Sequence, residues 1–397
     1  MTALRFHGAT LVDARGERQA DLLCRDGKIV GEVSPTLVTE DYKTVFAKGL
    51  YLSPGFCDVH QHGGGGGDYM DGTPDAFLRA ANAHLCHGTT TVLPTLLSAD
   101  REGTLLAIRA YLEAKKDPRI PLCLGGLHLE GPYLSPVQAG AQKPENIRAF
   151  QREEYTLLAE AAEGEVRRWS VAPEVEGMEE FARFAKQNGI LLSIAHSNAD
   201  ADTVRRAVAC GFSHVTHLYS CMSTVTRRGG FRVAGILEMA YLLDALSVEI
   251  IADGCHLPPD LLAYVAKCKP KDKITLITDA MRAAGEDAKE SFLGSPRDPL
   301  PVIVEDGVAK LCDRSAFAGS VATQDRLLRN MLSVGVSLTD GVAMLTRNPI
   351  REHLPLAKKG MLLPDYDADL CLFDESINVK AVLVGGEYRF STNAPTK

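Results

Sequence analysis

Residues 53–68, SPGFCDVHQHGGGGGD, combine the side chains of a metal site with a glycine run. Asp58, His60 and His62 are spaced by two, so on a strand all three side chains point to one face. Two imidazoles on one face can share a metal ion. A run of five glycines cannot comfortably continue a strand, so we expect a mobile or tightly packed loop here, over which a substrate could lie. A His-x-His pair alone suits a structural role equally well.

Strand and helix patterns alternate through the middle of the chain, which is typical of parallel strands joined by helical crossovers. Eight such units predict an α/β fold, a (β/α)8 TIM barrel, whose chemistry lies at the C-terminal ends of the strands. The predicted strands are residues 55–62, 89–95, 122–130, 167–174, 189–197, 212–218, 246–253 and 273–280.

Metal-compatible side chains gather at the predicted C-terminal strand ends, namely His62, Glu130, Glu174, His196, His217, Asp253 and Asp279. Glu130 precedes Gly-Pro and offers a hard oxygen ligand at that end of the barrel. Asp279 follows an apolar strand, and partial desolvation suits a carboxylate that both takes and gives a proton. The alternative for Asp279 is a cap at the start of a helix.

Other histidines are predicted to be structural. His84 and His87 lie one helical turn apart and away from the predicted active end of the barrel, and His214 begins its strand at the wrong end. His128 shares a strand face with Glu130 one pleat deeper, where support of the ligands is expected in place of direct ligation.

The two ends of the chain carry short strands and turn signals. Residues 1–52 predict a small antiparallel sheet with a hairpin at Asp26-Gly27, and residues 368–390 add further strands. We expect the ends to form one small β-sandwich domain from residues 1–53 and 349–397. The barrel then spans residues 54–348, with a β-hairpin insertion near 300–312 and a last helix that stops at Pro349.

The composition excludes some classes of protein. The chain has 397 residues, a net charge of −8 and 45% hydrophobic residues, which favours a globular protein and argues against a nucleic-acid-binding surface. No apolar run approaches a membrane span, and the N-terminus shows no leader pattern, so we expect a cytoplasmic protein without a membrane partner. The ten cysteines are scattered without CxxC, which suits a reducing compartment.

The chain resembles the amidohydrolase superfamily, and within it the deacetylases of amino-sugar phosphates. The resemblance covers nearly the whole chain, and the combination of HLEGP, THLY, ADGxH and TDA is specific where one alone would be weak. The matching segments, in order, are PGFCDVHQHGG, GLHLEGPYLSP with GAQKP, VAPE, IAHSNAD, THLYSCM, IIADGCH, LITDA and FAGS.

The resemblance implies a divalent metal, one or two ions per subunit, with zinc, iron, manganese and cobalt all compatible with the ligands. Glu130, His196 and His217 would bind the catalytic ion. His60 and His62 would hold a second ion, with Glu130 between the two. Asp279 matches the catalytic acid and base of the family.

The resemblance also implies a binding site for a sugar phosphate. The matching positions are Ala141, Gln142, Ser220, Cys221, Arg228 and His256, with Phe317, Ala318 and Gly319 as a loop over the substrate. The family usually has Asn-Ala where this chain has Ser220-Cys221, so an amide donor to phosphate is lost. Arg227, Arg228 and Arg232 can compensate, because guanidinium pairs bidentately with phosphate. The family histidine at His256 reaches a neighbouring subunit, which implies a homodimer.

The implied reaction is metal-assisted hydrolysis of N-acetyl-D-glucosamine 6-phosphate to D-glucosamine 6-phosphate and acetate, in amino-sugar catabolism. One alternative is a deacetylase for N-acetylgalactosamine 6-phosphate or another N-acyl substrate. A remote alternative is a non-catalytic amidohydrolase-like scaffold, and the presence of Glu130, His196, His217 and Asp279 together speaks against it.

Overall fold

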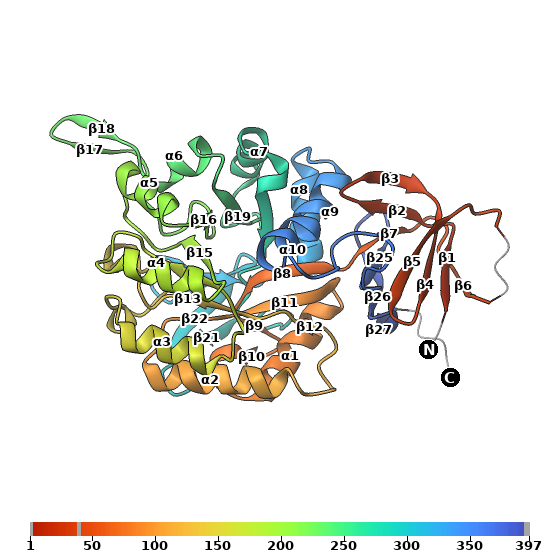
Figure 1. Ribbon diagram of the computed structural model, residues 1–397, viewed down its shortest axis with the longest axis horizontal. Helices are drawn as coiled ribbons and strands as arrows, with labels where there is room; N and C mark the ends of the chain where they lie inside the picture. Colours follow the sequence, from red (N-terminus) through yellow and green to blue (C-terminus); the bar gives the residue numbers. More distant parts are fainter. Residues whose placement is uncertain (1–2, 38–40, 393–397) are drawn as a thin grey trace.

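The computed structural model describes residues 3–37 and 41–392, and shows a large barrel beside a smaller pair of sheets (Figure 1). The outer ends of the predicted sandwich segments, residues 1–2 and 393–397, lie outside the described residues, as do residues 38–40. Within the described part of the chain, none of the helices is long and apolar enough to cross a membrane.

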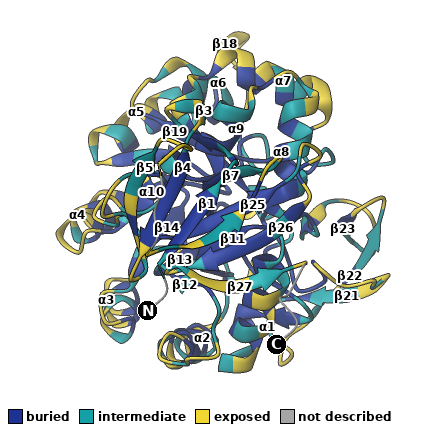
Figure 2. Ribbon diagram, turned by 90° about the vertical axis from the view of Figure 1, so that its right-hand side faces the viewer, coloured by how far each residue is buried: buried dark blue, intermediate teal, exposed yellow. Residues whose placement is uncertain are grey.

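Eight parallel strands form the barrel, which confirms the predicted fold class. In chain order they are β8 (Phe56–Gln61), β11 (Thr89–Leu96), β13 (Leu127–Glu130), β14 (Val166–Val171), β15 (Leu191–Ile194), β16 (Phe212–Val215), β19 (Ser247–Ile251) and β20 (Ile274–Ile277). The ends of β20 and β8 meet through two backbone hydrogen bonds, Asp279 N–H to His60 C=O at 2.9 Å and His62 N–H to Ala280 C=O at 2.8 Å. A short strand, β12 (Cys123–Leu124), pairs with β11 outside this path. The strands are buried almost throughout, because helices cover the barrel (Figure 2).

Helices connect the strands and pack apolar faces against them, with their exposed faces outward (Figure 2). Those of the barrel are α1 (Pro74–Leu85), α2 (Arg101–Ala114), α3 (Arg152–Ala161), α4 (Met178–Gln187), α5 (Ala201–Ala209), α6 (Ile236–Leu242), α7 (Pro259–Cys268) and α8 (Gln324–Ser333). Local capping fixes several starts. Asp100 accepts a hydrogen bond from the Gly103 N–H at 2.7 Å at the start of α2, and Asp200 accepts one from the Thr203 N–H at 3.0 Å at the start of α5.

The prediction that Pro349 ends the last helix is wrong. Helix α9 (Leu338–Leu345) already ends before it, and Pro349 lies in the first turn of α10 (Arg347–His353). A proline is tolerated in a first turn because the missing N–H has no partner there in any case.

Two sheets pack face to face at the joined ends of the chain, as predicted for a sandwich. One has the order β5-β4-β1-β6 and the other β27-β26-β25-β7-β2-β3. The strands are β1 (Leu4–His7), β2 (Thr10–Asp13), β3 (Gly16–Gln19), β4 (Asp21–Arg25), β5 (Lys28–Val33), β6 (Lys43–Phe46), β7 (Tyr51–Pro54), β25 (Leu370–Phe373), β26 (Val379–Val384) and β27 (Glu387–Ser391). Their shared core includes Phe6, Leu11, Leu22, Leu52 and Leu370.

The pairing of the N-terminal strands differs from the expected antiparallel sheet. Strands β1 and β6 pair in parallel, and so do β2 and β7. The reason is topological, because the chain passes between the two sheets after β1, after β3 and after β6, and a returning strand can enter in either direction. The predicted hairpin turn holds, with Asp26 and Gly27 at positive φ angles of 52° and 77°.

Two smaller β elements follow the C-terminal ends of barrel strands β16 and β20. One is a four-stranded sheet of β21 (Glu290–Leu293), β22 (Leu300–Glu305), β23 (Val308–Leu311) and β24 (Phe317–Ser320), in which β22 and β23 form a hairpin around Asp306-Gly307. The other is a hairpin of β17 (Thr226–Arg228) and β18 (Phe231–Val233), which projects from the barrel (Figure 1).

The glycine run after β8 is a tightly packed hairpin of β9 (Gly63–Gly64) and β10 (Gly67–Asp68). A Cβ atom on Gly63 would lie 2.1 Å from the Gly67 carbonyl oxygen, and one on Gly67 would lie 2.6 Å from that of Ala76. Larger residues would therefore push the chain away from the end of β8.

Candidate metal centre and active site

The six predicted metal-ligand and catalytic side chains converge at the C-terminal end of the barrel. They form two groups, His60 with His62 and Asp279, and Glu130 with His196 and His217, in each of which the ligand atoms lie within 4.8 Å of one another. All six side chains are buried. They come from five different strands, so only the closed barrel brings them together.

Glu130 lies between the two groups. Its Oε1 is 3.1 Å from His196 Nε2 and 3.0 Å from His217 Nε2. Its Oε2 is 3.4 Å from His62 Nε2. One carboxylate thus faces both groups, which is the arrangement expected of a ligand shared between two ions.

Three of the four imidazoles are fixed by hydrogen bonds at Nδ1, and each then turns its Nε2 towards the centre. The Nδ1 partners are the Glu249 carboxylate for His60 at 2.7 Å, the Thr95 carbonyl for His62 at 3.2 Å and the Gln138 carbonyl for His196 at 2.9 Å. An acceptor at Nδ1 requires the proton there and leaves the Nε2 lone pair for a metal.

The donor set fits a metal ion. His60 Nε2 is buried and has no hydrogen-bond partner among the described residues. The Nε2 atoms of His196 and His217 lie only 3.2 Å apart. Leaving a buried nitrogen unpaired costs about 1–3 kcal/mol, which a bound cation would remove. Imidazole with carboxylate is a donor set for zinc and related divalent ions.

The backbone is strained where these side chains leave the strands. His196, His217 and Asp279 have positive φ angles of 42°, 28° and 50°. Residues other than glycine adopt this region at a cost of order 1–3 kcal/mol each, and such residues cluster at functional sites.

The charges of the centre favour a cation. Burial lowers the pKa of His62, but hydrogen bonds with Asp279 and Glu130 outweigh it and raise the pKa to about 10. Burial likewise lowers the pKa of His60, and the charges of Glu249, Glu130 and Asp279 raise it to about 9. In the metal-free protein these imidazoles hold protons that a metal must displace.

Asp279 is buried, as its apolar strand predicted. Burial raises the pKa of this carboxyl, but the charge on His60 and the hydrogen bond with His62 lower it below its ordinary value. The described residues 282–285 that follow are turns, so the alternative of a helix cap has no helix to cap. Asp279 Oδ1 lies 3.1 Å from His62 Nε2, at the edge of the metal centre.

A cavity of about 220 Å³ opens over the metal centre. Most of the predicted substrate-binding residues line it, namely Ala141, Gln142, Ser220, Cys221, His256, Phe317 and Gly319. The cavity also has an apolar side at Leu97 and Leu293. The cavity therefore has buried ionisable groups at its base and a wall of polar and apolar residues, a combination that is common in small-molecule sites.

Two predicted substrate-binding residues do not line this cavity. Arg228 lies on the projecting hairpin, where its side chain is 75% exposed and 3.1 Å from Asp200. Ala318 is buried in a cluster with Met281. It points away because side chains alternate along β24, which turns its neighbours Phe317 and Gly319 to the cavity.

Comparison with known proteins places the chain in a family. Residues 51–389 match the sequence profile described as "Amidohydrolase family". The chain belongs to the amidohydrolase family. A relative from Lysinibacillus sphaericus, "N-acetylglucosamine-6-phosphate deacetylase", is 30% identical over 395 residues, which cover 98% of this chain and 99% of the relative. Another from Shewanella sp. (strain ANA-3), "N-acetylgalactosamine-6-phosphate deacetylase", is 31% identical over 85% of this chain and 82% of the relative.

Solved structures resemble this amidohydrolase over almost the whole chain. One is a mutant N-acetyl-D-glucosamine-6-phosphate deacetylase from Mycobacterium smegmatis in complex with N-acetyl-D-glucosamine-6-phosphate. It has a TM-score of 0.89 and 28% identity, with coverage of 98% of this chain and 99% of that one. The N-acetylglucosamine-6-phosphate deacetylase from Thermotoga maritima has a TM-score of 0.86 and 29% identity, with coverage of 98% and 100%.

The amidohydrolase centre rests on a buried ion pair that sequence reasoning missed. Glu249, in the middle of β19, is fully buried and receives hydrogen bonds from both terminal nitrogens of Arg168. The same carboxylate accepts from His60 Nδ1 at 2.7 Å and from the His217 backbone N–H at 3.2 Å. The available signal was a single charged residue inside the apolar strand LSVEIIAD, since such a residue is seldom buried unless it is paired.

Gln142, which was expected to bind the substrate, also contacts a metal-ligand candidate. Its amide Nε2 donates to Glu130 Oε2 at 3.0 Å, and its Oε1 accepts from the Ser98 N–H at 3.1 Å. The side chain therefore orients the shared carboxylate while it lines the cavity.

Two acidic residues at the active end of the barrel of this amidohydrolase organise loops. Glu174 accepts hydrogen bonds from Ser197 Oγ at 2.6 Å and from the Asn198 N–H at 2.5 Å. Asp253 accepts from His256 Nδ1 at 2.8 Å and from the His256 N–H at 2.8 Å. Neither belongs to a metal-binding group among the described residues.

The remaining predicted histidines make contacts with protein groups. His128 lies behind the metal centre, with its ring centroid 4.6 Å from that of His60 and its nitrogens bonded to Thr95 and Ser170. The others bond to protein partners away from the centre, His84 to the Gly63 carbonyl, His87 to Asp325 and His214 to Ser247.

Proposed function

We propose that this amidohydrolase removes the acetyl group from N-acetyl-D-glucosamine 6-phosphate in amino-sugar catabolism. The observation that carries the proposal is the convergence of Glu130, His196, His217 and Asp279 in one buried cavity whose other wall holds Ser220, Cys221 and His256. Relatives named for this activity, at about 30% identity over nearly the full length, support it.

The proposal places a divalent metal ion on Glu130, His196 and His217. His60 and His62 would hold a second ion, with Glu130 shared. When bound, the metal polarises the acyl oxygen and lowers the pKa of a water molecule towards about 7. Imidazole and carboxylate ligands suit zinc, iron, manganese or cobalt.

Asp279 moves the protons of the reaction. Its carboxylate accepts a proton from the attacking water, whose oxygen forms a bond to the acetyl carbon. The C–N bond then breaks, and Asp279 gives the proton to the departing nitrogen, because an amine leaves poorly as an anion. Atoms balance as amide plus water giving acetate plus the amino sugar.

The sugar phosphate is proposed to lie on the opposite side of the cavity from Leu97. The ring of His256 is fixed by Asp253 at Nδ1 and packs against Phe317 with centroids 4.7 Å apart. Its other nitrogen is then available to the substrate. Ser220 and Cys221 offer a hydroxyl and a thiol nearby in the same wall.

A homodimer is part of the proposal. Arg228 was predicted to bind phosphate, yet in its own chain it lies outside the cavity. Phe231 at the tip of the same hairpin is 80% exposed, and exposed apolar residues beside charged ones favour a protein interface.

The ten cysteines are free, which supports a reducing compartment such as the cytoplasm.

A specific observation favours a second substrate, N-acetylgalactosamine 6-phosphate, because relatives named for its deacetylation match at 30–31% identity. The test measures acetate release from both epimers and from unphosphorylated N-acetylglucosamine, before and after chelation, with metal quantified per chain. We expect chelator-sensitive turnover of the glucosamine phosphate with one or two ions per chain. Bound metal without turnover of any of the three would overturn the proposal and favour another acyl substrate or a scaffold.

A further inference from the structure

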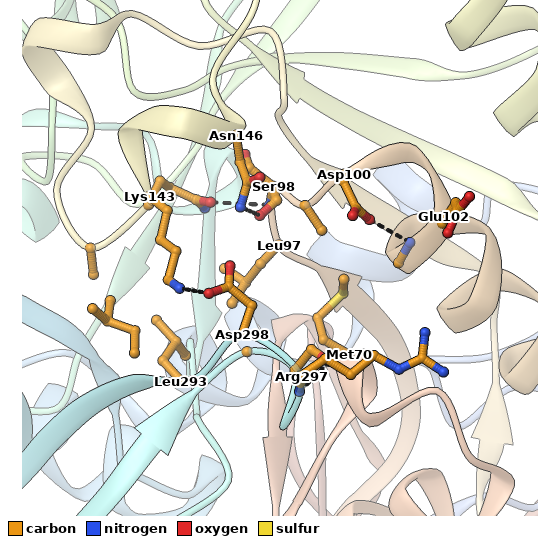
Figure 3. A pocket seen from close by; sticks show the side chains of 17 residues that line it. Met70, Leu97, Ser98, Asp100, Glu102, Lys143, Asn146, Leu293, Arg297 and Asp298 are labelled. Atoms are coloured by element: carbon orange, nitrogen blue, oxygen red, sulfur yellow. Dashed lines mark hydrogen bonds and ion pairs between the residues drawn. The ribbon is translucent and has the colours of Figure 1, made fainter.

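A second cavity, the side cavity, opens next to the metal-centre cavity and encloses about 140 Å³ (Figure 3). Its walls come from the segment after β11, the loop after β13, and the residues between β21 and β22. Met70, Leu97 and Leu293 are grouped around it in the close view, and Lys143 pairs with Asp298 across it (Figure 3).

The two cavities share a wall. Leu97, Ala141, Gln142 and Leu293 line both of them. Gln142 is also the residue that donates to Glu130, the carboxylate between the two metal-binding groups, at 3.0 Å. A group bound at the metal centre therefore has the side cavity as its immediate neighbour, with the side chains of Leu97, Ala141, Gln142 and Leu293 between them.

The side cavity lies across the barrel from Ser220, Cys221 and His256, whereas Ala141 and Gln142, which were also expected to bind the substrate, lie in the wall between the two cavities. Ser220 and Cys221 follow β16, and His256 follows β19. In the closed order of eight strands, β11 stands opposite β16 and β13 stands opposite β19. The segments after β11 and β13 that line the side cavity are thus on the far side of the metal centre from the sugar.

The geometry of an amide links these positions. The acyl carbon is planar, so its nitrogen and its alkyl substituent extend to different sides of the carbonyl. With the carbonyl at the metal centre and the sugar towards β16 and β19, the alkyl group extends towards Leu97 and Leu293. An acetyl methyl group ends at this wall, whereas a longer chain would continue beyond it.

We propose that the side cavity is an acyl-chain subsite, and that the enzyme hydrolyses N-propanoyl and N-butanoyl hexosamine 6-phosphates as well as the N-acetyl compound. The inference rests on the proposed function and extends its substrate class. The products are the amino sugar phosphate and propanoate or butanoate, formed by the same addition of water.

The lining offers apolar contacts to a short aliphatic chain. Met70, Leu97, Leu293 and Leu300 supply these contacts, in a wall that also holds polar and charged residues such as Ser98, Asn146 and Arg297. The charge of Lys143 is neutralised by Asp298, so it does not offer a free partner to a terminal carboxylate. Asp100 and Glu102 in the same wall further disfavour an anionic chain.

The first test compares kcat/KM for the N-acetyl, N-propanoyl and N-butanoyl derivatives of glucosamine 6-phosphate. We expect kcat/KM for the butanoyl compound to stay within about 30-fold of that for the acetyl compound. If the acyl pocket instead ended at the acetyl methyl group, the two extra methylenes would overpack it and the loss would be larger. A larger loss overturns the subsite. If butanoate is released but acetate is not, the acetyl assignment is wrong and the subsite stands. If neither is released, both proposals are overturned.

A pair of variants tests whether the acyl chain of the substrate lies in the side cavity. Ala99→Leu fills the side cavity from a position that does not line the metal-centre cavity, so kcat/KM for the acetyl compound should be unchanged while that for the butanoyl compound falls about 10-fold. Ala99→Ser, which adds little volume, is the matched control. Equal effects of Ala99→Leu on both substrates, or none on either, would place the chain elsewhere. Leu97→Ala widens the shared wall and should raise the butanoyl-to-acetyl ratio.

Discussion

The metal centre and the sugar-phosphate side of the same cavity are built by different means. At the metal centre, His60, Glu130 and His217 are buried and lie on or directly after three different strands of a closed barrel, β8, β13 and β16. On the side proposed for the sugar phosphate, Phe317 is 38% exposed and, like Ser220 and His256, lies outside the barrel strands. The barrel itself therefore fixes the reacting groups, while surrounding segments set which acyl sugar reaches them.

The largest expected effect is at Asp279. Asp279→Asn keeps the shape and one oxygen donor but cannot accept a proton, so kcat should fall about 10³-fold with metal content unchanged. The measurement is steady-state acetate release with metal quantified per chain. A variant with most of its turnover left would remove Asp279 from proton transfer, and loss of metal would make it a ligand before a base.

The next effect concerns the support of the metal centre. Glu249→Gln weakens the hold on His60 Nδ1 and removes the charge that balances Arg168. Loss of such a supporting carboxylate typically costs 10- to 100-fold in metal affinity. Competition with a chelator of known affinity measures it without any reliance on turnover.

Glu154→Gln is the matched control for Glu249→Gln. Glu154 is a buried carboxylate that pairs with Arg148 at 2.8 Å and belongs to no metal-binding group among the described residues. Equal metal affinities of the two variants would contradict the role of Glu249. If an unpaired Arg168 unfolds the single variant, the double variant with Arg168→Met removes that buried charge and keeps the measurement possible.

The sugar-phosphate side should respond in substrate affinity. His256→Ala removes a ring that Asp253 and Phe317 hold in the cavity wall, so KM for the phosphorylated substrate should rise about 10-fold with a smaller change in kcat. Unphosphorylated N-acetylglucosamine is the control substrate, and its KM should move less. A fall in kcat alone would assign His256 to the reaction instead of to binding.

Arg228→Ala tests whether this exposed residue takes part in substrate binding. In its own chain Arg228 does not line the cavity, so a severalfold rise in KM is expected through a second copy of the chain. Light scattering on the same samples shows whether that copy is present. An unchanged KM in a dimer would leave Arg228 as a surface partner of Asp200 and remove it from substrate binding.

The extent of sequence prediction follows the same division. All eight barrel strands were predictable because short strand patterns alternate with helical ones, and Glu130 and His217 were placed because barrel chemistry lies at strand ends. The Arg168–Glu249 pair was not, since its partners lie 81 residues apart and meet only inside the closed barrel. Arg228 and Ala318 were misplaced relative to the cavity because a hairpin projection and the alternation of β24 decide their directions.

The smallest expected effect tests a histidine that the metal centre does not use. Burial lowers the pKa of His87, but the hydrogen bond with Asp325 outweighs it and raises the pKa from 6.5 to about 10. Burial raises the pKa of Asp325, and His87 lowers it to about 2. The folded state therefore holds the His87 proton more tightly than the unfolded state does, and the pair stabilises most between about pH 4 and 6.5.

His87→Gln should lower Tm by about 2 °C at pH 6, with a difference that shrinks as the pH rises towards 10 because wild-type His87 then loses its proton. Thermal unfolding at pH 6, 8 and 9.5 measures it. Turnover should stay at the wild-type level, since His87 lines neither cavity. A pH-independent difference would mean that packing, and not the charge pair, accounts for the loss. Reduced turnover at unchanged Tm would instead mean that the His87–Asp325 pair influences the metal centre, which would contradict its purely structural role.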